Sequence, residues 1–328
     1  MLYGCRASVT FLGYPGRMKI EAIRRLAAPT PLLHPERPLW RFGKSPAPLG
    51  RLGDLEVRLA GSSAEVRRAQ ALRYRVFYEE MAAVADFRTR QTRRDADRFD
   101  RFCDHLLVID HARAGRSRFG LPNIVGTYRL LRQEIAEEIG GFYSAGEFEL
   151  APLIRRNPHL SVLELGRSCV LPDYRNKRTL ELLWHGIWAY VLRHRADVMI
   201  GCASLEGTDP EQLALPLSFL HHHCGAPEEW RVGAHAARRV EMNRMPVDAI
   251  DARAALRSLP PLIKGYLRLG AFIGDGAVID RQFGTIDVAI VLPVAAIAAR
   301  YVDHYGADAG RYAVSRARKP EDASRVAA

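Results

Sequence analysis

The sequence predicts a mixed α/β fold, a central sheet flanked by helices, and three observations lead to this fold class. Segments rich in Val, Leu, Ile and Tyr, bounded by Gly, Pro or Asn, indicate strands at 105–110, 123–131 and 162–171. Residues 179–194 have the periodicity of an amphipathic helix, and an apolar, strand-like run follows at 198–204. A strand, turn, helix and strand in succession, preceded by antiparallel strands, favour a mixed sheet.

The other expected elements flank this core. The alternating run 55–60 predicts an early strand, and a Ser cap followed by apolar residues at helical spacing predicts a helix over 63–81. A connection rich in Arg and Asp follows at 88–101. Later in the chain the pattern predicts helices over 210–223 and 259–271, and one or two strands over 277–294.

The chain divides into three parts by composition. Residues 1–50 are rich in proline and arginine, so we expect a poorly ordered basic tail, with Met18 as an alternative start. Residues 51–305 are expected to form one catalytic domain, with a C-terminal extension over about 255–305. The polar residues 306–328 are expected to form a second tail.

Charge and cysteine content restrict the class of protein. The 328 residues include 48 Lys and Arg against 37 Asp and Glu, a formal charge of +11, which predicts an acidic partner. That partner is a protein, an anionic membrane surface or a nucleic acid. Five cysteines without a CxxC pair argue against a disulfide framework or a zinc knuckle and indicate reduced thiols in a cytoplasmic protein.

Membrane insertion and secretion are not expected. The most apolar stretch, 288–299, is shorter than the roughly 20 residues that a membrane-spanning helix needs, and Pro293 interrupts it. The N-terminal residues lack a sustained apolar region and a cleavage site of small residues.

Acidic residues after the first helix form one candidate site. Arg73 and Phe77 lie on that helix, and Asp97 and Asp100 follow in the charged connection. Two carboxylates three residues apart can bind a cation jointly or raise each other's pKa. The alternative is a solvated loop whose aspartates balance its own arginines.

Two strands carry a second candidate site. Arg129 lies on one strand, and Glu164 and Arg167 lie on another. Regular pleating would direct Glu164 and Arg167 to opposite faces, but a bulge at Gly166 would return both to one side. A glutamate in an apolar strand is a candidate base or amine-binding group, and a surface ion pair is the alternative.

A basic turn follows that strand and precedes a helix. Arg175, Lys177 and Arg178 lie at the helix N-terminus, where backbone N–H groups and cationic side chains bind phosphate. Cys169 is interpreted as a small buried thiol rather than a nucleophile. His221, His222, His223 and Cys224 point around one helix, so no metal site is expected, while Asp280 and Asp287 are candidates to line an acceptor pocket.

Several segments resemble known acyltransferases. Val170 followed by Arg175 resembles the phosphate loop of GNAT acyltransferases, with Arg178 and Leu180 where small residues are expected, which weakens the case for acetyl-coenzyme A. The order of Arg73, Asp97, Arg129 and Glu164 is similar to that of acyl-homoserine lactone synthases. Over about 55–302 the chain resembles bacterial L-ornithine Nα-acyltransferases, in the segments LRYRVFYEEM, FCDHLLVID, VGTYRLL, FYSAGEFEL, LELGRSCVLPDYR, GCASLEGTDP, LPPLIKGYLRLGA and GDGAVID.

This resemblance implies a GNAT-like fold and a specific reaction. The α-amine of L-ornithine would attack the thioester of 3-hydroxyacyl-acyl carrier protein, giving lyso-ornithine lipid in the first step of ornithine lipid synthesis. No cofactor would be bound, since the phosphopantetheine arm of the carrier presents the donor. Glu164 would be the base or proton relay, and Asp97 and Asp100 would contact ornithine or organise the acceptor loop. Arg129 and Arg167 would hold the acceptor carboxylate or keep the acids ionised.

The resemblance also implies a surface for the acidic carrier protein. The strand before the phosphate loop would splay and expose backbone N–H groups near Cys169 and Val170 to the thioester. The residues expected to bind substrate or carrier are Arg73, Phe77, Cys169, Val170, Arg175, Lys177, Arg178, Lys264 and Arg268.

Alternative functions and partners stay open at this point. The same donor with glycine or glutamine as acceptor is a second enzyme hypothesis. Many members of the family are described as hemolysin-like, so a membrane-active protein is the hypothesis from another class. A nucleic-acid partner is not expected, because no zinc-finger, RNP or helix-turn-helix pattern is present. We expect a cytoplasmic enzyme, with contact to the inner membrane left open and a second acyltransferase acting on its product.

Overall fold

The computed structural model describes residues 46–112 and 122–297. In these ranges nine strands form one sheet in the order β1-β2-β3-β4-β5-β6-β9-β8-β7. Adjacent strands are antiparallel except β5 and β6, which are parallel. The strands are β1 (Gly50–Leu52), β2 (Leu55–Leu59), β3 (Asp104–Asp110), β4 (Asn123–Arg132), β5 (Val162–Val170), β6 (Val198–Glu206), β7 (Arg239–Val240), β8 (Phe272–Asp280) and β9 (Thr285–Pro293).

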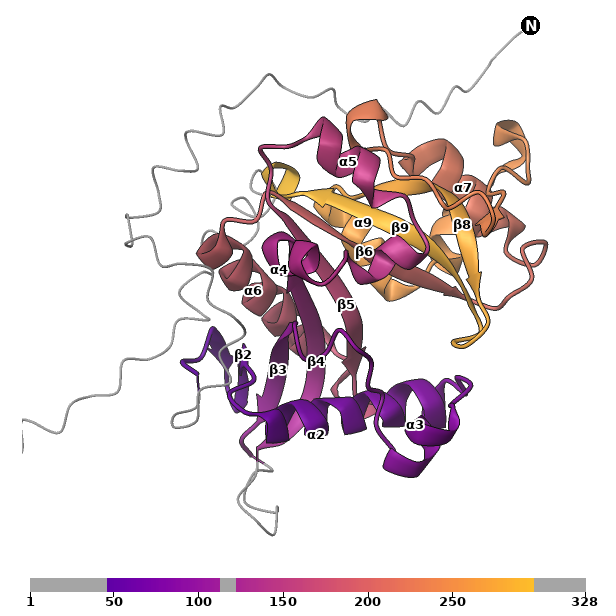
Figure 1. The fold of residues 1–328 in the computed structure, drawn as a ribbon. Helices are drawn as coiled ribbons and strands as arrows, with labels where there is room; N and C mark the ends of the chain where they lie inside the picture. The colour runs from indigo at the N-terminus through magenta and orange to yellow at the C-terminus, as the bar shows by residue number, and fades with distance from the viewer. Residues whose placement is uncertain (1–45, 113–121, 298–328) are drawn as a thin grey trace, which may run out of the picture. The chain divides into compact units, whose positions relative to one another are not determined.

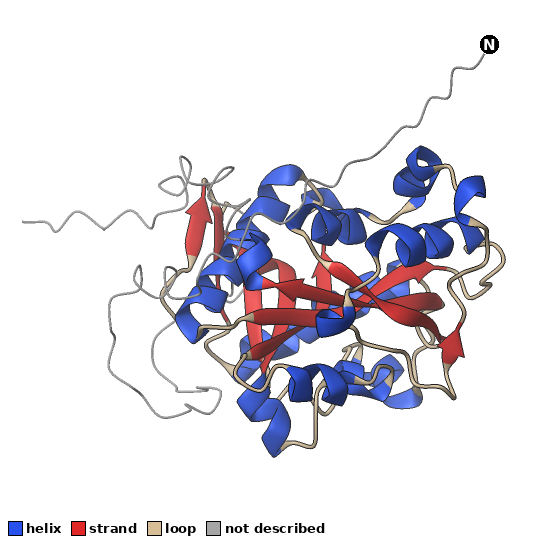
Figure 2. Ribbon diagram, turned by 90° about the horizontal axis from the view of Figure 1, so that it is seen from above, coloured by secondary structure: helices blue, strands red, loops and turns tan. Residues whose placement is uncertain are grey.

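Helices cover both faces of this sheet (Figures 1 and 2). One face packs against α6, α7 and α9, and the other packs against α2 and α4. The expected mixed sheet with flanking helices is confirmed. The helices are α2 (Ser63–Tyr74), α3 (Phe87–Thr92), α4 (Gln133–Glu138), α5 (Leu150–Arg156), α6 (Lys177–His194), α7 (Ala214–Cys224), α8 (Ala252–Ser258) and α9 (Pro261–Leu269), with shorter helical turns η1 (Arg75–Glu80), η3 (Tyr143–Gly146), η4 (Pro172–Tyr174), η5 (Glu228–Trp230) and η6 (Val247–Ala249).

The two helices beside the candidate sites begin at side-chain caps. Ser62 accepts a hydrogen bond from the Glu65 N–H at the start of α2, and Asn176 accepts one from the Thr179 N–H at the start of α6. The predicted helix over 63–81 is α2 continued by the π-helical turn η1. The predicted connection at 88–101 contains the short helix α3.

Strands β5 and β6 separate after a short parallel ladder. Only Val162 to Glu164 pair with Val198 to Ile200, whereas β6 continues to pair with β9 as far as Glu206. At Gly201, a Cβ atom would lie 2.4 Å from the Leu165 carbonyl oxygen, so a larger residue would clash where the strands part. The predicted splay of the strand before the phosphate loop is confirmed, and it opens the sheet between β5 and β6.

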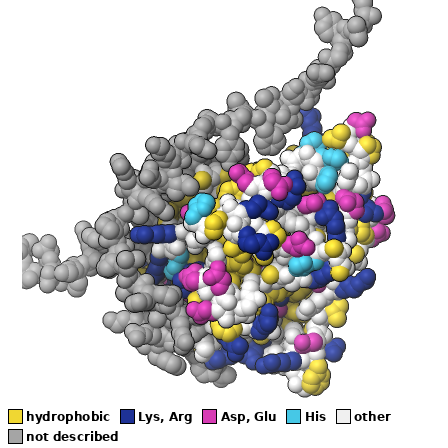
Figure 3. All heavy atoms as spheres, turned by 45° about the horizontal axis from the view of Figure 1, so that its top comes forward, with side chains coloured by type: hydrophobic (Ala, Val, Ile, Leu, Met, Phe, Trp, Pro, Cys, Tyr) yellow, Lys and Arg dark blue, Asp and Glu magenta, His cyan; other side chains and the backbone are white. Residues whose placement is uncertain are grey.

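The described residues carry no net charge. They contain 31 Lys and Arg against 31 Asp and Glu, so the excess of 11 positive charges lies entirely in residues 1–45, 113–121 and 298–328. On the face drawn in Figure 3, basic and acidic side chains are interspersed. The net charge is therefore no evidence of a basic surface on the described part of the chain.

The predicted tails fall outside the description, apart from residues 46–50, of which Gly50 begins β1. The C-terminal extension is predicted over about 255–305, and the structure describes it as far as residue 297. This part of the chain contributes β8 and β9 to the same sheet. No helix among the described residues is long and apolar enough to cross a membrane.

Candidate functional site

A cavity of about 1190 Å³ opens where β5 and β6 separate. Its lining includes Trp184 of α6 and Lys264 of α9 on one face of the sheet, and Ser144 of η3 and Phe77 of η1 on the other. The cavity thus extends through the gap between the strands, from the face covered by α6 and α9 to the face covered by α2 and α4.

A bulge in β5 shapes the wall of this cavity. Thr127 pairs with Cys169 and Arg129 pairs with Gly166, so β5 holds one more residue than β4 between these pairs. Arg167 has φ +50°, a left-handed conformation that is uncommon for a residue with a Cβ. The bulge expected at Gly166 is confirmed one residue further on, and both Glu164 and Arg167 line the cavity.

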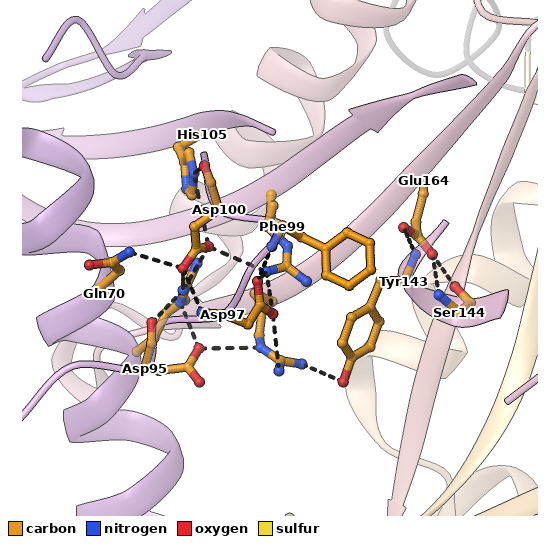
Figure 4. A network of polar contacts seen from close by, with 12 residues as sticks. Gln70, Asp95, Asp97, Phe99, Asp100, His105, Tyr143, Ser144 and Glu164 are labelled. Atoms are coloured by element: carbon orange, nitrogen blue, oxygen red, sulfur yellow. Dashed lines mark hydrogen bonds and ion pairs between the residues drawn. The ribbon is translucent and has the colours of Figure 1, made fainter. Parts of the chain in front are cut away.

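A buried network of arginines and aspartates stands beside this bulge (Figure 4). The Arg73 side chain is 1% exposed and pairs with Asp95 at 2.8 Å and Asp100 at 2.8 Å. Asp100 also accepts a hydrogen bond from Gln70 at 2.9 Å, and its carbonyl contacts His105 Nε2 at 2.8 Å. Burial alone would raise the pKa of Asp100, but the charge and hydrogen bonds of Arg73 hold it well below its ordinary value.

The network extends to the cavity through two further arginines. Arg129 donates two hydrogen bonds to the Asp97 carboxylate at 2.7 and 2.6 Å. Arg167 lies 3.2 Å from Asp95 and donates to the Tyr143 hydroxyl at 3.1 Å. Burial opposes ionisation of Asp97, but Arg129 keeps its pKa lowered. The loop that carries the aspartates is therefore fixed against β4 and β5.

Glu164 is buried and holds the turn η3. Its carboxylate accepts hydrogen bonds from the Tyr143 N–H at 2.8 Å, from the Ser144 N–H at 2.7 Å and from the Ser144 hydroxyl. Burial raises the pKa of Glu164, although the hydrogen bonds from Ser144 and Tyr143 oppose the shift. A carboxylate of raised pKa joined to a hydroxyl at the cavity wall can accept a proton through that hydroxyl.

A second acidic group lies on the same face of the sheet, formed by residues of β6 and β9 and by Glu147, which follows η3. One ligand atom each of Glu147, Cys202 and Asp287 lies within 4.8 Å of the others. Asp287 accepts hydrogen bonds from the hydroxyls of Thr285, at 2.9 Å, and Ser204. Burial raises the pKa of Asp287 and of Glu147, and their mutual proximity raises that of Glu147 further.

The positive charge of the basic turn after β5 is partly compensated by acidic residues of the same chain. Arg175 donates to the Val170 carbonyl at 3.0 Å and makes a two-hydrogen-bond pair with Glu80. Lys177 is exposed and lies 3.6 Å from Glu181. Across the cavity mouth, α9 contributes Lys264 and Arg268 to the lining.

Sequence comparisons identify the family. Residues 72–185 match the acetyltransferase (GNAT) domain family. The chain is 55% identical over 264 residues to the L-ornithine N(alpha)-acyltransferase of Rhizobium meliloti (strain 1021), covering 80% of this chain and 88% of the relative. It is 56% identical over 269 residues to that of Brucella abortus (strain 2308), covering 80% and 93%. The chain belongs to the L-ornithine N(alpha)-acyltransferase family.

It is therefore an acyltransferase with a GNAT domain and the expected GNAT-like fold. Among solved structures, the N-acyl amino acid synthase FeeM from uncultured soil microbes aligns with TM-score 0.40 and 10% identity, covering 74% of this chain and 91% of that chain. The acyl-homoserine lactone synthase LasI aligns with TM-score 0.39 and 12% identity, covering 73% and 90%.

Most of the residues predicted to form the site lie together in the lining of the cavity between β5 and β6. The cavity lining includes the predicted residues Phe77, Arg129, Glu164, Arg167, Cys169, Val170, Arg175, Lys177, Lys264 and Arg268, together with Asp280 and Asp287.

Two predictions of direct contact need correction. Arg73 cannot bind carrier or substrate in this arrangement, because its guanidinium is buried and paired with two aspartates. Asp100 cannot contact ornithine, because Arg73, Arg129 and Gln70 surround its buried carboxylate; it organises the loop, the second role predicted for it. Arg178 is exposed and lies outside the cavity lining, next to the turn at Gly53, so its contact with the carrier stays a prediction.

Two other predicted residues are restricted by their contacts. The guanidinium of Arg175 is engaged by Glu80 and Val170, so its charge is already compensated. Cys169 is buried and burial raises the pKa of its thiol to about 12, which agrees with a structural thiol and not a nucleophile. His222 contacts Asn243 at 2.9 Å, and none of the three adjacent histidines belongs to the group near Asp287.

Sequence reasoning missed the turn that completes the site. Tyr143 and Ser144 lie in the segment FYSAGEFEL, and Cys202 lies in GCASLEGTDP, but no pattern in the sequence predicts a role for these three residues. Their contacts with Glu164, Arg167 and Asp287 join segments far apart in the chain. The only available signal was their place within segments that resemble the family.

Proposed function

We propose that this acyltransferase transfers a 3-hydroxyacyl chain from acyl carrier protein to the α-amine of L-ornithine. The relatives named L-ornithine N(alpha)-acyltransferase support the acceptor. The observation that carries the proposal is a cavity that passes through the sheet and differs at its two ends. Apolar and cationic side chains of α6 and α9 line one end, and the polar groups of Arg167, Ser144 and Asp287 line the other.

The reaction forms one amide bond and breaks one thioester bond. The neutral α-amine attacks the thioester carbonyl, the oxyanion intermediate collapses, and the carrier leaves as a thiolate. The nitrogen loses two protons in all: the ammonium group gives up one before the attack, and the tetrahedral intermediate gives up the second, which balances the proton that the departing thiolate takes up. The enzyme must align amine and thioester, accept the first proton and stabilise the oxyanion.

In this proposal Glu164 accepts the ammonium proton through the Ser144 hydroxyl. Ser144 lines the cavity and donates to the Glu164 carboxylate, so the two groups form a short path for the proton. Burial raises the pKa of Glu164, which makes it a better base than an exposed glutamate. Arg167, at the bulge, is placed to hold the acceptor carboxylate, and it is more accessible than Arg129.

The end of β5 offers a donor for the oxyanion. The Leu171 N–H bonds the Val125 carbonyl on β4 at 2.9 Å. Successive residues of a strand direct their N–H groups to alternate edges, so the Val170 N–H points away from β4 and toward the gap. The Val170 carbonyl, which accepts from Arg175, lies on that same edge. By the same alternation the Cys169 N–H faces β4, so of the two predicted donors Val170 is the one we assign to the thioester.

The carrier would approach the end lined by α6 and α9. Lys177, Lys264 and Arg268 line that end, together with Leu180, Glu181 and Trp184. This local cluster, rather than the net charge of the chain, supports an acidic carrier bearing phosphopantetheine.

Reconstitution with the purified full chain tests the proposal. We expect N-acylornithine, detected by mass spectrometry, from 3-hydroxyacyl-acyl carrier protein and L-ornithine, and much slower turnover with the coenzyme A thioester or with glycine or glutamine. Arg268→Glu should raise KM for the acyl carrier protein about tenfold and leave KM for ornithine unchanged. Arg253→Glu, an exposed arginine of α8 outside the cavity lining, is the matched control. Equal rates with both thioesters would refute the carrier as preferred donor, and equal acylation of glycine would refute the acceptor.

A further inference from the structure

Asp287 differs from Asp95, Asp97 and Asp100 in forming no ion pair with a cation among the described residues. Asp287 is 7% exposed and lines the cavity. The groups that contact its carboxylate are the hydroxyls of Thr285 and Ser204. Among the described residues no Lys, Arg or His forms an ion pair with it, whereas its neighbour Glu147 pairs with Arg238 at 3.2 Å.

Such a carboxylate is costly unless a ligand compensates it. Burying an ionised group without an opposite charge is strongly unfavourable, and hydroxyl donors recover part of that cost. Asp95, Asp97 and Asp100 are each paired with an arginine of the protein itself, so their charge is compensated without a ligand. Asp287 instead lines the cavity, where a cationic substrate group can reach it.

We propose that Asp287, supported by the hydroxyls of Ser204 and Thr285, binds the side-chain ammonium of the acceptor and selects a diamino acid over acceptors that lack this group. This inference rests on the proposed function, because it concerns the acceptor of that reaction. It identifies a specificity residue on β9 that is separate from the residues that handle the α-amine.

The spacing of the site fits one amino acid. The Cys202 thiol contacts the Ser144 hydroxyl and lies within 4.8 Å of a carboxylate oxygen of Asp287. A single side chain therefore separates the proton relay at Ser144 from Asp287. Arg167 is near enough that its charge opposes the raised pKa of Asp287. An acceptor with its α-amine at Ser144 and its carboxylate at Arg167 can extend its side chain over Cys202 to Asp287.

An ammonium group fits this position better than a metal ion. Metal binding by cysteine needs the thiolate, and burial with the nearby carboxylates raises the pKa of Cys202 well above its ordinary value. Glu147 is engaged by Arg238 and by the Cys202 thiol. Asp287 and the hydroxyls that support it are hydrogen-bonding groups of the kind that recognise an ammonium group.

The test compares L-ornithine with L-norvaline, which has the same carbon chain without the δ-amine. In Asp287→Asn we expect KM for ornithine to rise about 10- to 100-fold, as for a lost charged hydrogen bond, with kcat changed less. KM for norvaline should stay constant or fall, so the discrimination between the two acceptors collapses. Asp275→Asn, at a partly buried aspartate of β8 that pairs with Arg239 outside the cavity lining, is the matched control and should keep the wild-type discrimination. Ser204→Ala keeps the charge and should raise KM for ornithine a few-fold.

The outcomes separate the two proposals. If the wild type acylates ornithine and Asp287→Asn keeps the full preference over norvaline, the role of Asp287 is wrong and the proposed function stands. If the wild type does not acylate ornithine, both fail. Activity that is lost with EDTA, restored by Zn²⁺ and insensitive to Zn²⁺ in Asp287→Asn would make the group a metal site and overturn the inference. If Asp287→Asn does not fold, Ser204→Ala provides the test, and an unchanged KM for ornithine in Ser204→Ala would contradict the inference.

Discussion

Two buried acidic groups flank the cavity, and they differ in what compensates their charge. Asp95, Asp97 and Asp100 lie against Arg73, Arg129 and Arg167, and the pKa values of Asp97 and Asp100 are lowered. Asp287 and Glu147 are also buried, but their pKa values are raised, and among the described residues Asp287 has hydroxyl donors alone. In the first group each aspartate is paired with an arginine; in the second, Glu147 pairs with Arg238 and Asp287 forms no ion pair among the described residues.

This difference separates residues that build the site from residues that meet the substrate. A buried carboxylate surrounded by arginines has no capacity left for a ligand, and its removal leaves buried cations behind. A buried carboxylate without a cation lowers the stability of the empty enzyme and provides binding energy for a cationic acceptor. Variants in the two groups should therefore differ in stability, in activity and in their response to pH.

The largest effect is expected from breaking the compensated group. Asp100→Asn removes the charge that faces Arg73 and Arg129, and we expect the free energy of unfolding to fall by about 3 to 5 kcal/mol. Urea unfolding of the purified protein measures this loss. Asp248→Asn, an exposed aspartate of η6, is the control. A loss below about 1 kcal/mol would show that the network is not integral to the fold.

The next effect concerns the proton relay. Glu164→Gln should lower kcat about 100-fold or more and flatten its acidic pH dependence, because the amide cannot accept the proton. Ser144→Ala keeps the backbone N–H contacts to Glu164 and removes only the hydroxyl, so we expect a smaller loss of about tenfold. Full turnover of Glu164→Gln with an unchanged pH profile would refute the relay.

The two groups should respond to pH with opposite sign. Asp100 has a native pKa below its ordinary 3.8, so the native state binds fewer protons and the stabilisation it provides above pH 3.8 is lost as the pH falls through the native pKa. Asp287 has a native pKa above 3.8, so its contribution to stability is full below pH 3.8 and declines as the pH rises through the native pKa. Urea unfolding between about pH 2 and 8 measures both.

Relative to wild type, Asp100→Asn should lose most stability near neutral pH and least in acid. Asp287→Asn should gain stability relative to wild type as the pH rises. Parallel stability curves for wild type and Asp287→Asn would contradict an uncompensated buried charge.

The smallest effect is expected for Asp287→Asn at neutral pH without substrate. Because this change removes a charge that no described cation balances, the free energy of unfolding should stay within about 1 kcal/mol of wild type or rise. Addition of L-ornithine should then raise the melting temperature of the wild type and not that of the variant. A large loss of stability would place Asp287 among the structural acids.

Local patterns in the sequence predicted much of the fold. Alternation and helical periodicity located β3 to β6 and α6, and Gly166 between Glu164 and Arg167 predicted the bulge. These features depend on neighbours in the chain. The beginning of α7 at Ala214 instead of residue 210 and the short helix α3 within a charged connection show the limits of such patterns.

The site was predicted less completely, because it depends on contacts across the sheet. Asp100 and Arg73 were both singled out, but their pairing at 27 residues' separation, which closes both to substrate, is a tertiary contact. Similarly, Asp287 follows Asp280 in a hairpin, and sequence alone gives no sign that Cys202 connects it to Ser144. Charge composition was the least informative quantity, since the described residues are neutral overall.

A crystal structure of the full chain with bound L-ornithine tests the central contrast most directly. We predict the δ-nitrogen within about 3 Å of an Asp287 carboxylate oxygen and the α-carboxylate at Arg167, with the pairs of Arg73 to Asp95 and Asp100 unchanged. Ornithine whose side-chain nitrogen lies at Asp97 or Asp100, or points to solvent away from Asp287, would contradict the account.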